Sequence, residues 1–309
     1  MGGSGSGGRY FRSDIDSIRK KLHDSENKTE DTQYESEIAN ILASLLVKYN
    51  DRNTEAINIH LTEIKNALQK ELEGTIDILF GGSVAKHTYV DGLSDIDSLV
   101  ILDNCELADN PPGEAMNYLS QRLRERFPKT EVHVGKMAVT IRFSDAEIQL
   151  LPAISCRKEI KIGNRTGNGW AQINPKQFTG ALTEINQQLG NKLIPVVKLA
   201  KAIIANLPEK HQISGYHAES LAVEMFKDYT EQYRPKTMLK YYFQQASELV
   251  QRPIPDYTGQ SVHVDEYLGA ANSLERKIVS DAYSRVYRRM SNADNARISD
   301  EWHKLFGEL

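Results

Sequence analysis

Along the chain, apolar side chains first recur every three or four positions and later every second position. Between residues 34 and 49, and again between 57 and 68, the period fits amphipathic helices. After Gly74 the residues Ile76, Ile78 and Phe80 alternate, and 98–102 is a short apolar run, so strands are predicted on both sides of a glycine-containing loop. Further strands are predicted at 131–135, 137–143 and 147–154.

From Asn174 onwards the strand pattern nearly vanishes, and prolines punctuate helical segments. The predicted fold class is therefore α+β, with an antiparallel or mixed sheet, flanking helices and a helical second half. Three parts are expected: a cloning scar or flexible leader at 1–8, a sheet lobe with the N-terminal helices at 9–173, and a helical lobe at 174–309.

Charge and cysteine content limit the setting. A net charge of −4 gives no global attraction to nucleic acid. No apolar run approaches the ~20 residues of a membrane span, so a soluble protein with no membrane partner is expected. Cys105 and Cys156 are far apart and lack metal-ligand spacing, which favours reduced thiols and a cytoplasmic location.

Candidate chemistry is concentrated in FGGSVAKHTYVDGLSDIDSLV, residues 80–100. If Gly82 and Ser83 end a strand and open a helix, the backbone N–H groups there form an anion site that suits a phosphate. In the next strand, Asp95 and Asp97 share one face about 6 to 7 Å apart. Two such carboxylates can hold Mg²⁺ together with substrate phosphates, whereas a bare D-x-D is more often a capped turn or a solvated edge.

At these residues the sequence resembles the nucleotidyltransferase superfamily, whose fold is polymerase beta-like. QLLPAI (149–154), IPVVKLAKAI (194–203) and ISGYHAESLA (213–222) extend the resemblance to the bacterial CD-NTases, relatives of cyclic GMP-AMP synthase and oligoadenylate synthase, over residues 35–290. The resemblance implies a Mg²⁺-dependent (alternatively Mn²⁺-dependent) cytoplasmic enzyme. Such enzymes join nucleoside triphosphates, here with ATP expected among them, into cyclic di- or trinucleotide messengers of the anti-phage system called CBASS.

Carried over by position, the resemblance makes Asp95 and Asp97 the metal ligands. The residues expected to hold the nucleotide are Gly82, Ser83, Lys198, Lys201, Ser214 and Tyr216. The lysines could instead form a solvated helix edge, and Tyr216 could be an ordinary packed aromatic. His217 is expected to be a core or surface histidine rather than a base or a ligand.

The family's third acidic position, three residues before the proline of LLPA, is Gln149 in this chain. An amide oxygen can coordinate a cation, but it cannot take up the proton of the attacking hydroxyl. Glu147 lies two residues earlier and belongs to the same strand face. Three explanations stay open: Glu147 substitutes for the missing aspartate, two aspartates suffice, or the sequence has been disabled by mutation.

Two other functions remain as alternatives. One is a nucleotidyltransferase that makes linear products or modifies RNA or protein, and the other is a catalytically impaired nucleotide-binding protein. An activating protein partner and DNA binding on a basic surface are further hypotheses, against the simpler interpretation of solvated charges. The basic residues concerned are Arg122, Arg124, Arg126, Lys129, Arg276, Lys277, Arg285, Arg288, Arg289 and Arg297.

Overall fold

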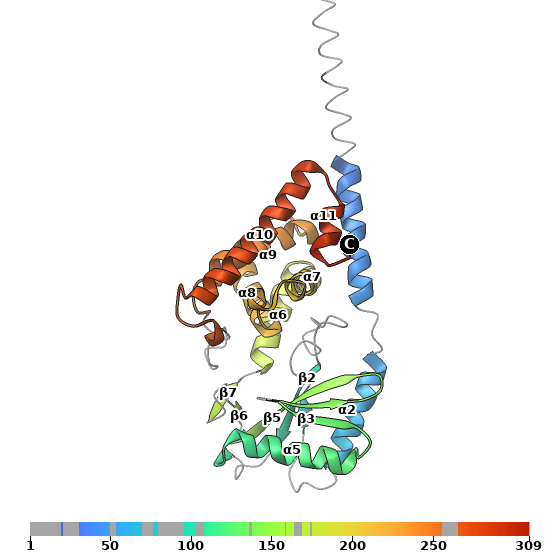
Figure 1. The fold of residues 1–309 in the computed structure, drawn as a ribbon, viewed down its shortest axis with the longest axis vertical. Helices are drawn as coiled ribbons and strands as arrows, with labels where there is room; N and C mark the ends of the chain where they lie inside the picture. The colour runs from blue at the N-terminus through green and yellow to red at the C-terminus, as the bar shows by residue number, and fades with distance from the viewer. Residues whose placement is uncertain are drawn as a thin grey trace, which may run out of the picture.

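The computed structural model places the chain in two lobes (Figure 1). It describes residues 20, 31–49, 54–69, 77–79, 96–102, 108–135, 138–157, 159–163, 169–173, 175–254 and 265–308. A sheet with flanking helices forms the lower lobe in Figure 1, and a group of packed helices forms the upper lobe. Within these ranges, no helix has both the length and the apolar character that crossing a membrane requires.

The sheet lobe contains one mixed sheet. Its described elements are α2 (Thr54–Gln69), β1 (Asp77–Leu79), β2 (Ile96–Leu102), α5 (Pro112–Arg126), β3 (Glu131–Val134), β4 (Val139–Arg142), β5 (Glu147–Cys156), β6 (Glu159–Gly163) and β7 (Trp170–Ile173). The strand order is β1-β2-β5-β4-β3, and β6 joins β5 to β7. β2 and β5 run parallel, while the other described pairs are antiparallel, so the predicted α+β class is confirmed.

The helices α2 and α5 cover one face of this sheet. Ile148 and Leu150 of β5 are fully buried there and share a core with Ile64 of α2 and Leu119 of α5. Burying each such side chain contributes roughly 1.5–3 kcal/mol. Because strand side chains alternate between faces, the intervening residues of β5 belong to the opposite face, which α2 and α5 leave open for a site.

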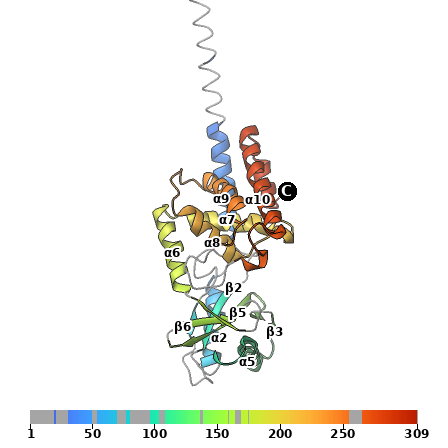
Figure 2. The same cartoon turned by 90° about the vertical axis from the view of Figure 1, so that its left-hand side faces the viewer.

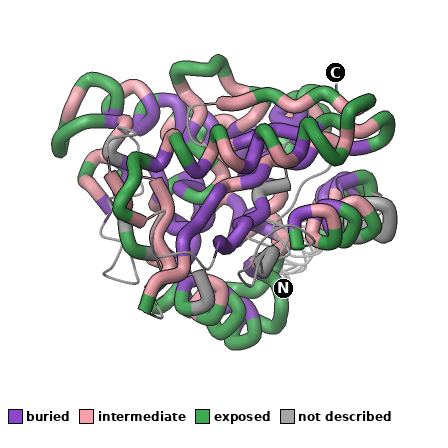
Figure 3. Tube along the Cα trace, turned by 90° about the horizontal axis from the view of Figure 1, so that it is seen from below, coloured by how far each residue is buried: buried purple, intermediate pink, exposed green. Residues whose placement is uncertain are grey.

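The helical lobe comes after β7, which ends at Ile173, and its first helix begins at Pro175. Its elements are α6 (Pro175–Gln188), α7 (Leu193–Ala205), α8 (Gly215–Phe226), α9 (Pro235–Leu249), α10 (Leu274–Ala296) and α11 (Asp300–Leu305), with 3₁₀ turns η1 (Glu209–His211) and η2 (Glu266–Leu268). Large aromatic side chains such as Tyr242, Phe243 and Tyr283 fill its core. Figure 3 shows the buried positions gathered on the strands and on the inner sides of the helices.

The helix at 31–49 packs on the helical lobe, although the expected division placed it with the sheet. Ile38 and Leu42 are buried in the same core as α7, α9 and α10. The Trp302 indole donates a hydrogen bond to the Tyr34 hydroxyl at 3.0 Å, and that hydroxyl donates to Asp294 at 3.0 Å. Figures 1 and 2 both show this helix, in blue, alongside the C-terminal helices. An amphipathic stripe predicts a buried face but does not say which lobe covers it.

Arg276 is part of the core and not of a basic surface, which corrects the expectation for this residue. Its guanidinium is fully buried and pairs with Asp265 at 2.7 Å. It also donates to the backbone oxygens of Val250, Arg252 and Gly269. A buried charge is tolerated only when it is paired and hydrogen-bonded, and here one side chain ties the end of α9 to the segment before α10.

Cys156, the last residue of β5, is disulfide-bonded. The chain has one other cysteine, Cys105, which lies outside the described residues. The expectation of two reduced thiols is therefore contradicted.

Replacing Leu42 by Ala should destabilise the helical lobe in particular. The Leu42 side chain is 1% exposed, and deleting such a buried side chain typically costs about 2–5 kcal/mol. Hydrogen exchange should then accelerate in α9 and α10, with little change in β4 and β5. Val47→Ala is the matched control, because Val47 lies on the same helix and is 70% exposed. Faster exchange confined to the sheet would contradict the assignment of this helix to the helical lobe.

Candidate functional site

The parallel pairing of β2 and β5 sets the geometry of the predicted metal site. Asp97 of β2 is in register with Gln149 of β5, with Ile96 level with Ile148 on one side of that pair and Ser98 level with Leu150 on the other. Residues paired in this way belong to the same face of a sheet. Gln149, which occupies the third acidic position of the motif, is thus level with Asp97, the second aspartate of the D-x-D.

The rest of the motif lies outside the described residues. Asp95 precedes the first residue of β2, and Gly82 and Ser83 lie between β1 and β2. The predicted roles of these three residues in binding metal and triphosphate therefore remain predictions. The described strands β1 and β2, which pair antiparallel, do agree with the predicted strands on both sides of the loop.

Gln149 owes its position to the alternation of β5. Its neighbours Ile148 and Leu150 are both 0% exposed and pack towards α2 and α5, whereas Gln149 is only partly buried. Glu147 and Leu151 share the parity of Gln149 and are also partly buried. The strand therefore presents a carboxylate, an amide and an apolar side chain in turn on the face opposite the two helices.

Glu147 forms an ion pair across the sheet. Its carboxylate accepts a hydrogen bond from the Arg142 Nε at 2.6 Å, and the two residues are in register between β4 and β5. Arg142 also lies 3.4 Å from Glu131 of β3. The hydrogen bond that Arg142 donates to Glu147 raises the pKa of the Arg142 guanidinium above its usual value. Glu147 is thus engaged by Arg142 of β4, while Gln149 is level with Thr140 of β4 and with Asp97 of β2.

In the helical lobe, the predicted nucleotide-binding residues of α7 and α8 come together. Ser214 is the N-cap of α8, and its hydroxyl oxygen accepts a hydrogen bond from the His217 N–H at 3.2 Å. A Cβ atom on Gly215 would lie 3.0 Å from the Lys201 Cε and 3.1 Å from its Nζ. The lysine therefore lies against the α8 N-terminus, where a larger residue than glycine would crowd it.

The two lysines have different surroundings. Lys201 is 8% exposed, and its ammonium donates a hydrogen bond to Glu219 of α8 at 3.1 Å. Lys198 is half-buried, and both burial and the nearby charge of Lys201 lower its pKa. The alternative of a solvated helix edge is therefore wrong for Lys201. Sequence reasoning missed Glu219, although a single carboxylate in the apolar stretch AESLAV was a signal that it had a buried partner.

Tyr216 follows the α8 N-cap and is 37% exposed, one of the more exposed large apolar side chains described. Its ring packs against Phe178 of α6, with the ring centroids 4.8 Å apart and the planes tilted by 56°. Its accessible surface leaves room for stacking on a base. Phe178 was not among the predicted site residues because α6 reads as an ordinary amphipathic helix.

His217 is a core histidine, as one of the two expectations had it. The side chain is 0% exposed, and burial lowers its pKa to about 4, so the ring is neutral at pH 7. Its Nδ1 lies 2.8 Å from the hydroxyl oxygen of Tyr267. Tyr267 follows a segment without a periodic pattern, so no sequence signal pointed to it.

The basic residues do not form one surface. Arg122 and Arg124 lie on α5 in the sheet lobe, whereas Arg285, Arg288 and Arg289 line a groove along α10 in the helical lobe. Several of these charges have partners: Arg122 with Glu125, Arg289 with Glu301, and Arg297 with Asp31. The arginines on α5 and those on α10 are thus two separate groups, and DNA binding by either group remains a hypothesis.

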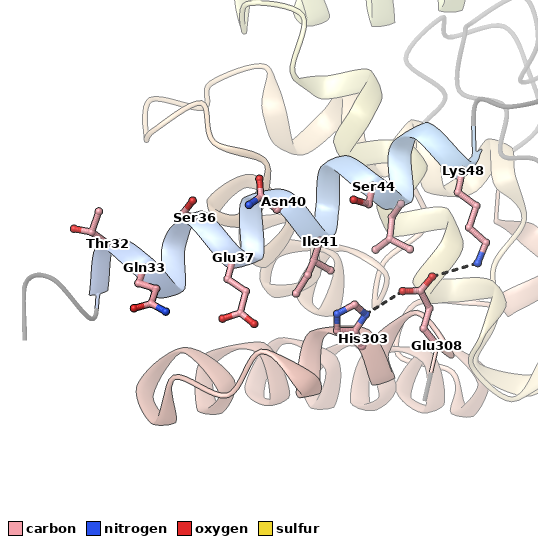
Figure 4. Close-up of a pocket in the computed structure, with 11 residues that line it drawn as sticks. Thr32, Gln33, Ser36, Glu37, Asn40, Ile41, Ser44, Lys48, His303 and Glu308 are labelled. Atoms are coloured by element: carbon pink, nitrogen blue, oxygen red, sulfur yellow. Dashed lines mark hydrogen bonds and ion pairs between the residues drawn. The ribbon is translucent and has the colours of Figure 1, made fainter.

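A separate groove of about 860 Å³ lies between the helix at 31–49 and the end of the chain (Figure 4). Lys48 and His303 both contact the Glu308 carboxylate there, at 3.2 Å and 3.0 Å. None of the predicted site residues lines this groove, which is bordered mainly by uncharged polar side chains.

Comparison with known proteins identifies the family. Residues 34–186 match the model of the Second Messenger Oligonucleotide or Dinucleotide Synthetase domain, SMODS. No curated protein matches the sequence. Among solved structures, the CdnC:HORMA-deltaN complex of E. coli MS115-1 is similar with a TM-score of 0.65 and 16% identity, over 86% of this chain and 96% of that one.

Two other solved structures have the same fold. CdnG, a CD-NTase of Bradyrhizobium diazoefficiens in complex with GTP, has a TM-score of 0.66 at 14% identity, over 88% of this chain and 95% of that one. The cyclic AMP-GMP synthase DncV of Vibrio cholerae, with nonhydrolyzable GTP, has a TM-score of 0.59 at 13% identity, over 96% and 90%. Residues 34–186 therefore belong to the SMODS family of nucleotidyltransferase domains, and the chain as a whole has the fold of the bacterial CD-NTases.

Proposed function

We propose that this protein condenses nucleoside triphosphates, with ATP among them, into a cyclic di- or trinucleotide messenger of anti-phage defence. The observation that carries the proposal is that Asp97 and Gln149 are in register on adjacent parallel strands. Asp95 is two residues before Asp97 in the sequence. The SMODS domain and the likeness to structures described as a cyclic AMP-GMP synthase and as CdnC with ATP support the same reaction class.

The residues present fit a divalent cation. Asp95 and Asp97 bring carboxylates and Gln149 an amide oxygen, and oxygen donors are the ligands that hard cations such as Mg²⁺ or Mn²⁺ take. Among the residues that the structure describes, no three His, Cys, Asp or Glu side chains form a group that could hold a metal ion. When bound, the cation supplies charge stabilisation to the reacting α-phosphate and the leaving pyrophosphate.

In this proposal the two aspartates hold the cation and Gln149 orients the attacking ribose hydroxyl. An amide oxygen accepts a hydrogen bond from that hydroxyl but does not take its proton, so the proton released on attack passes to solvent water. Glu147 is disfavoured as the proton acceptor because Arg142 already engages its carboxylate at 2.6 Å. Of the three explanations for the missing aspartate, the sufficiency of two aspartates is the one that this pairing supports. Catalysis then depends mainly on positioning and charge stabilisation.

The α7 and α8 residues are proposed to hold the triphosphate and the base. The N-terminus of α8 carries orphan backbone N–H groups and the positive end of the helix dipole. Lys201, paired with Glu219, lies against this turn, and Lys198 is one helical turn earlier and close enough to be affected by the Lys201 charge; both are proposed to face the triphosphate. Tyr216, backed by Phe178, is proposed to stack on the base.

A catalytically impaired nucleotide-binding protein is the second candidate, favoured by one observation, the amide at position 149. A protein partner is also proposed, since the similar CdnC was solved in complex with a HORMA protein. Such a partner could be needed for turnover, which would leave the isolated chain inactive.

We expect a phosphatase-resistant product when the protein is incubated with Mg²⁺ and α-³²P-labelled ATP, GTP, CTP and UTP. Asp97→Asn should lower product formation by at least about a hundredfold, because even groups beyond the ligand sphere contribute roughly 10–100-fold at metal sites. Thin-layer chromatography after phosphatase treatment measures both. A product that phosphatase degrades would instead support the linear-product alternative.

Gln149→Asp should raise turnover by roughly a hundredfold, because it adds a general base beside the attacking hydroxyl. Glu147→Gln should change turnover less than about twofold, because the carboxylate of Glu147 is held by Arg142. Initial rates of pyrophosphate release at saturating substrate measure both variants. A large loss in Glu147→Gln with no gain in Gln149→Asp would show that Glu147 is the proton acceptor.

Lys198→Met should weaken binding of a nonhydrolysable ATP analogue by about tenfold, since charge-assisted hydrogen bonds are worth about 1.5–3 kcal/mol. Isothermal titration calorimetry in the presence of Mg²⁺ measures the affinity. Lys192→Met is the matched control, because Lys192 is exposed at the N-cap of the same helix. Equal losses in both variants would show a general effect of charge rather than a contact at Lys198.

A further inference from the structure

A series of polar contacts within the helical lobe links the Ser214 turn to the core. The backbone N–H of Ser214 donates a hydrogen bond to the Tyr267 hydroxyl oxygen at 3.1 Å. The same hydroxyl lies 2.8 Å from the Nδ1 of His217, a ring that is 0% exposed. Tyr267 belongs to η2, more than fifty residues further along the chain, so a distant segment holds the turn that opens α8.

The direction of these hydrogen bonds follows from the groups around the ring. The Tyr267 oxygen accepts from Ser214, so its own proton is available to donate to the His217 Nδ1. The ring proton is then on Nε2, which faces a carboxylate oxygen of Asp265 at 3.9 Å. The opposite assignment would point the Nε2 lone pair at that carboxylate, which is repulsive. His217 is therefore neutral with its proton on Nε2.

The last residue in this series of contacts, Asp265, is fixed in the core. Asp265 accepts hydrogen bonds from the Arg276 guanidinium at 2.7 Å and from the Ile254 N–H at 3.0 Å. Asp265 and Arg276 are both 0% exposed. Because this ion pair also ties the end of α9 to the start of α10, the residues under the Ser214 turn cannot shift without disturbing the core.

The first residue in this series of contacts, Ser214, presents a hydroxyl donor. The Ser214 oxygen already accepts from the His217 N–H, so its hydrogen is directed away from the helix. The backbone N–H of Ser214 is taken by Tyr267, so the turn offers a hydroxyl proton and the first-turn N–H groups of α8 in a fixed orientation. Fixed donors bind an anion without the entropy cost of ordering them.

We propose that Tyr267 and His217 are positioning residues that hold the Ser214 turn in the conformation that receives the triphosphate. The inference rests on the proposed function, in which the α8 N-terminus holds the phosphates. Neither residue touches the nucleotide in this arrangement. Each acts through Ser214: the Tyr267 hydroxyl oxygen accepts from the Ser214 backbone N–H, and the His217 ring holds that hydroxyl in place.

Tyr267→Phe tests the proposal, because it removes the hydroxyl and keeps the ring. We expect the affinity for a nonhydrolysable ATP analogue with Mg²⁺ to fall about tenfold, and hydrogen exchange at the Ser214 amide to accelerate, with exchange in α7 and α10 unchanged. Tyr283→Phe is the matched control, because its hydroxyl is also buried in this lobe and has no hydrogen-bond partner among the described residues. Unchanged affinity and unchanged Ser214 exchange in Tyr267→Phe would overturn the proposal.

The outcome for this inference is separable from that for the proposed function. If the unmodified protein binds none of the four nucleoside triphosphates, the proposed function fails. The Ser214 exchange rate in Tyr267→Phe still decides whether Tyr267 positions the turn. A rise in exchange throughout the lobe would mean a general loss of stability and would also overturn the positioning role.

The tautomer of His217 gives a test that needs no variant. The ¹⁵N chemical shifts of the imidazole at pH 7 should show Nε2 protonated and Nδ1 unprotonated, and the reverse would overturn the hydrogen-bond direction. His217→Asn, which keeps an acceptor near the Nδ1 position, should retain nucleotide affinity within about threefold. His217→Leu should lose about as much affinity as Tyr267→Phe, and equal affinities of the two His217 variants would contradict the proposal.

Discussion

The parallel pairing of β2 with β5 is the constraint on which the sheet side of the site depends. A parallel pair cannot be closed by a short turn, so the chain between these strands must leave the sheet and return. That segment provides α5, which covers the same face as α2, and the strands β3 and β4. The sheet is thus buried on one face by α2 and α5, and the register leaves Asp97 and Gln149 side by side.

In the helical lobe, the corresponding constraint is that buried charges must be paired. Lys201 with Glu219, and Arg276 with Asp265, are charges that apolar surroundings would otherwise disfavour. Each pair also lies beside a part of the proposed site: Lys201 is against the α8 N-terminus, and Asp265 ends the series of contacts that starts at Ser214. Replacing such pairs by apolar residues could retain stability, so their value lies in fixing where the donors point.

The elements could be predicted from the sequence because their periods are local, but their partners could not. The strand 147–154 and the helices at 34–49 and 57–68 were predicted from spacing alone, and the D-x-D motif drew its interpretation from the strands predicted around it. The pairing of Gln149 with Asp97 depends on the register between β2 and β5, which are far apart in the sequence, so no local pattern predicts it. Tyr267 follows a stretch without periodicity, so its contact with Ser214 becomes visible only in three dimensions.

The two halves of the proposed site are in different lobes, and the course of the chain decides how they are joined. The helix at 31–49 packs in the helical core, whereas α2, which follows it, packs on the sheet. The chain returns to the helical lobe between Ile173 and Pro175. Along the described residues the chain passes between the lobes twice, so a change in the angle between the lobes would move the α8 turn relative to Gln149 without breaking either core. In the proposed function, a partner protein that changed this angle would change the separation of the phosphate donors from the oxygen ligands.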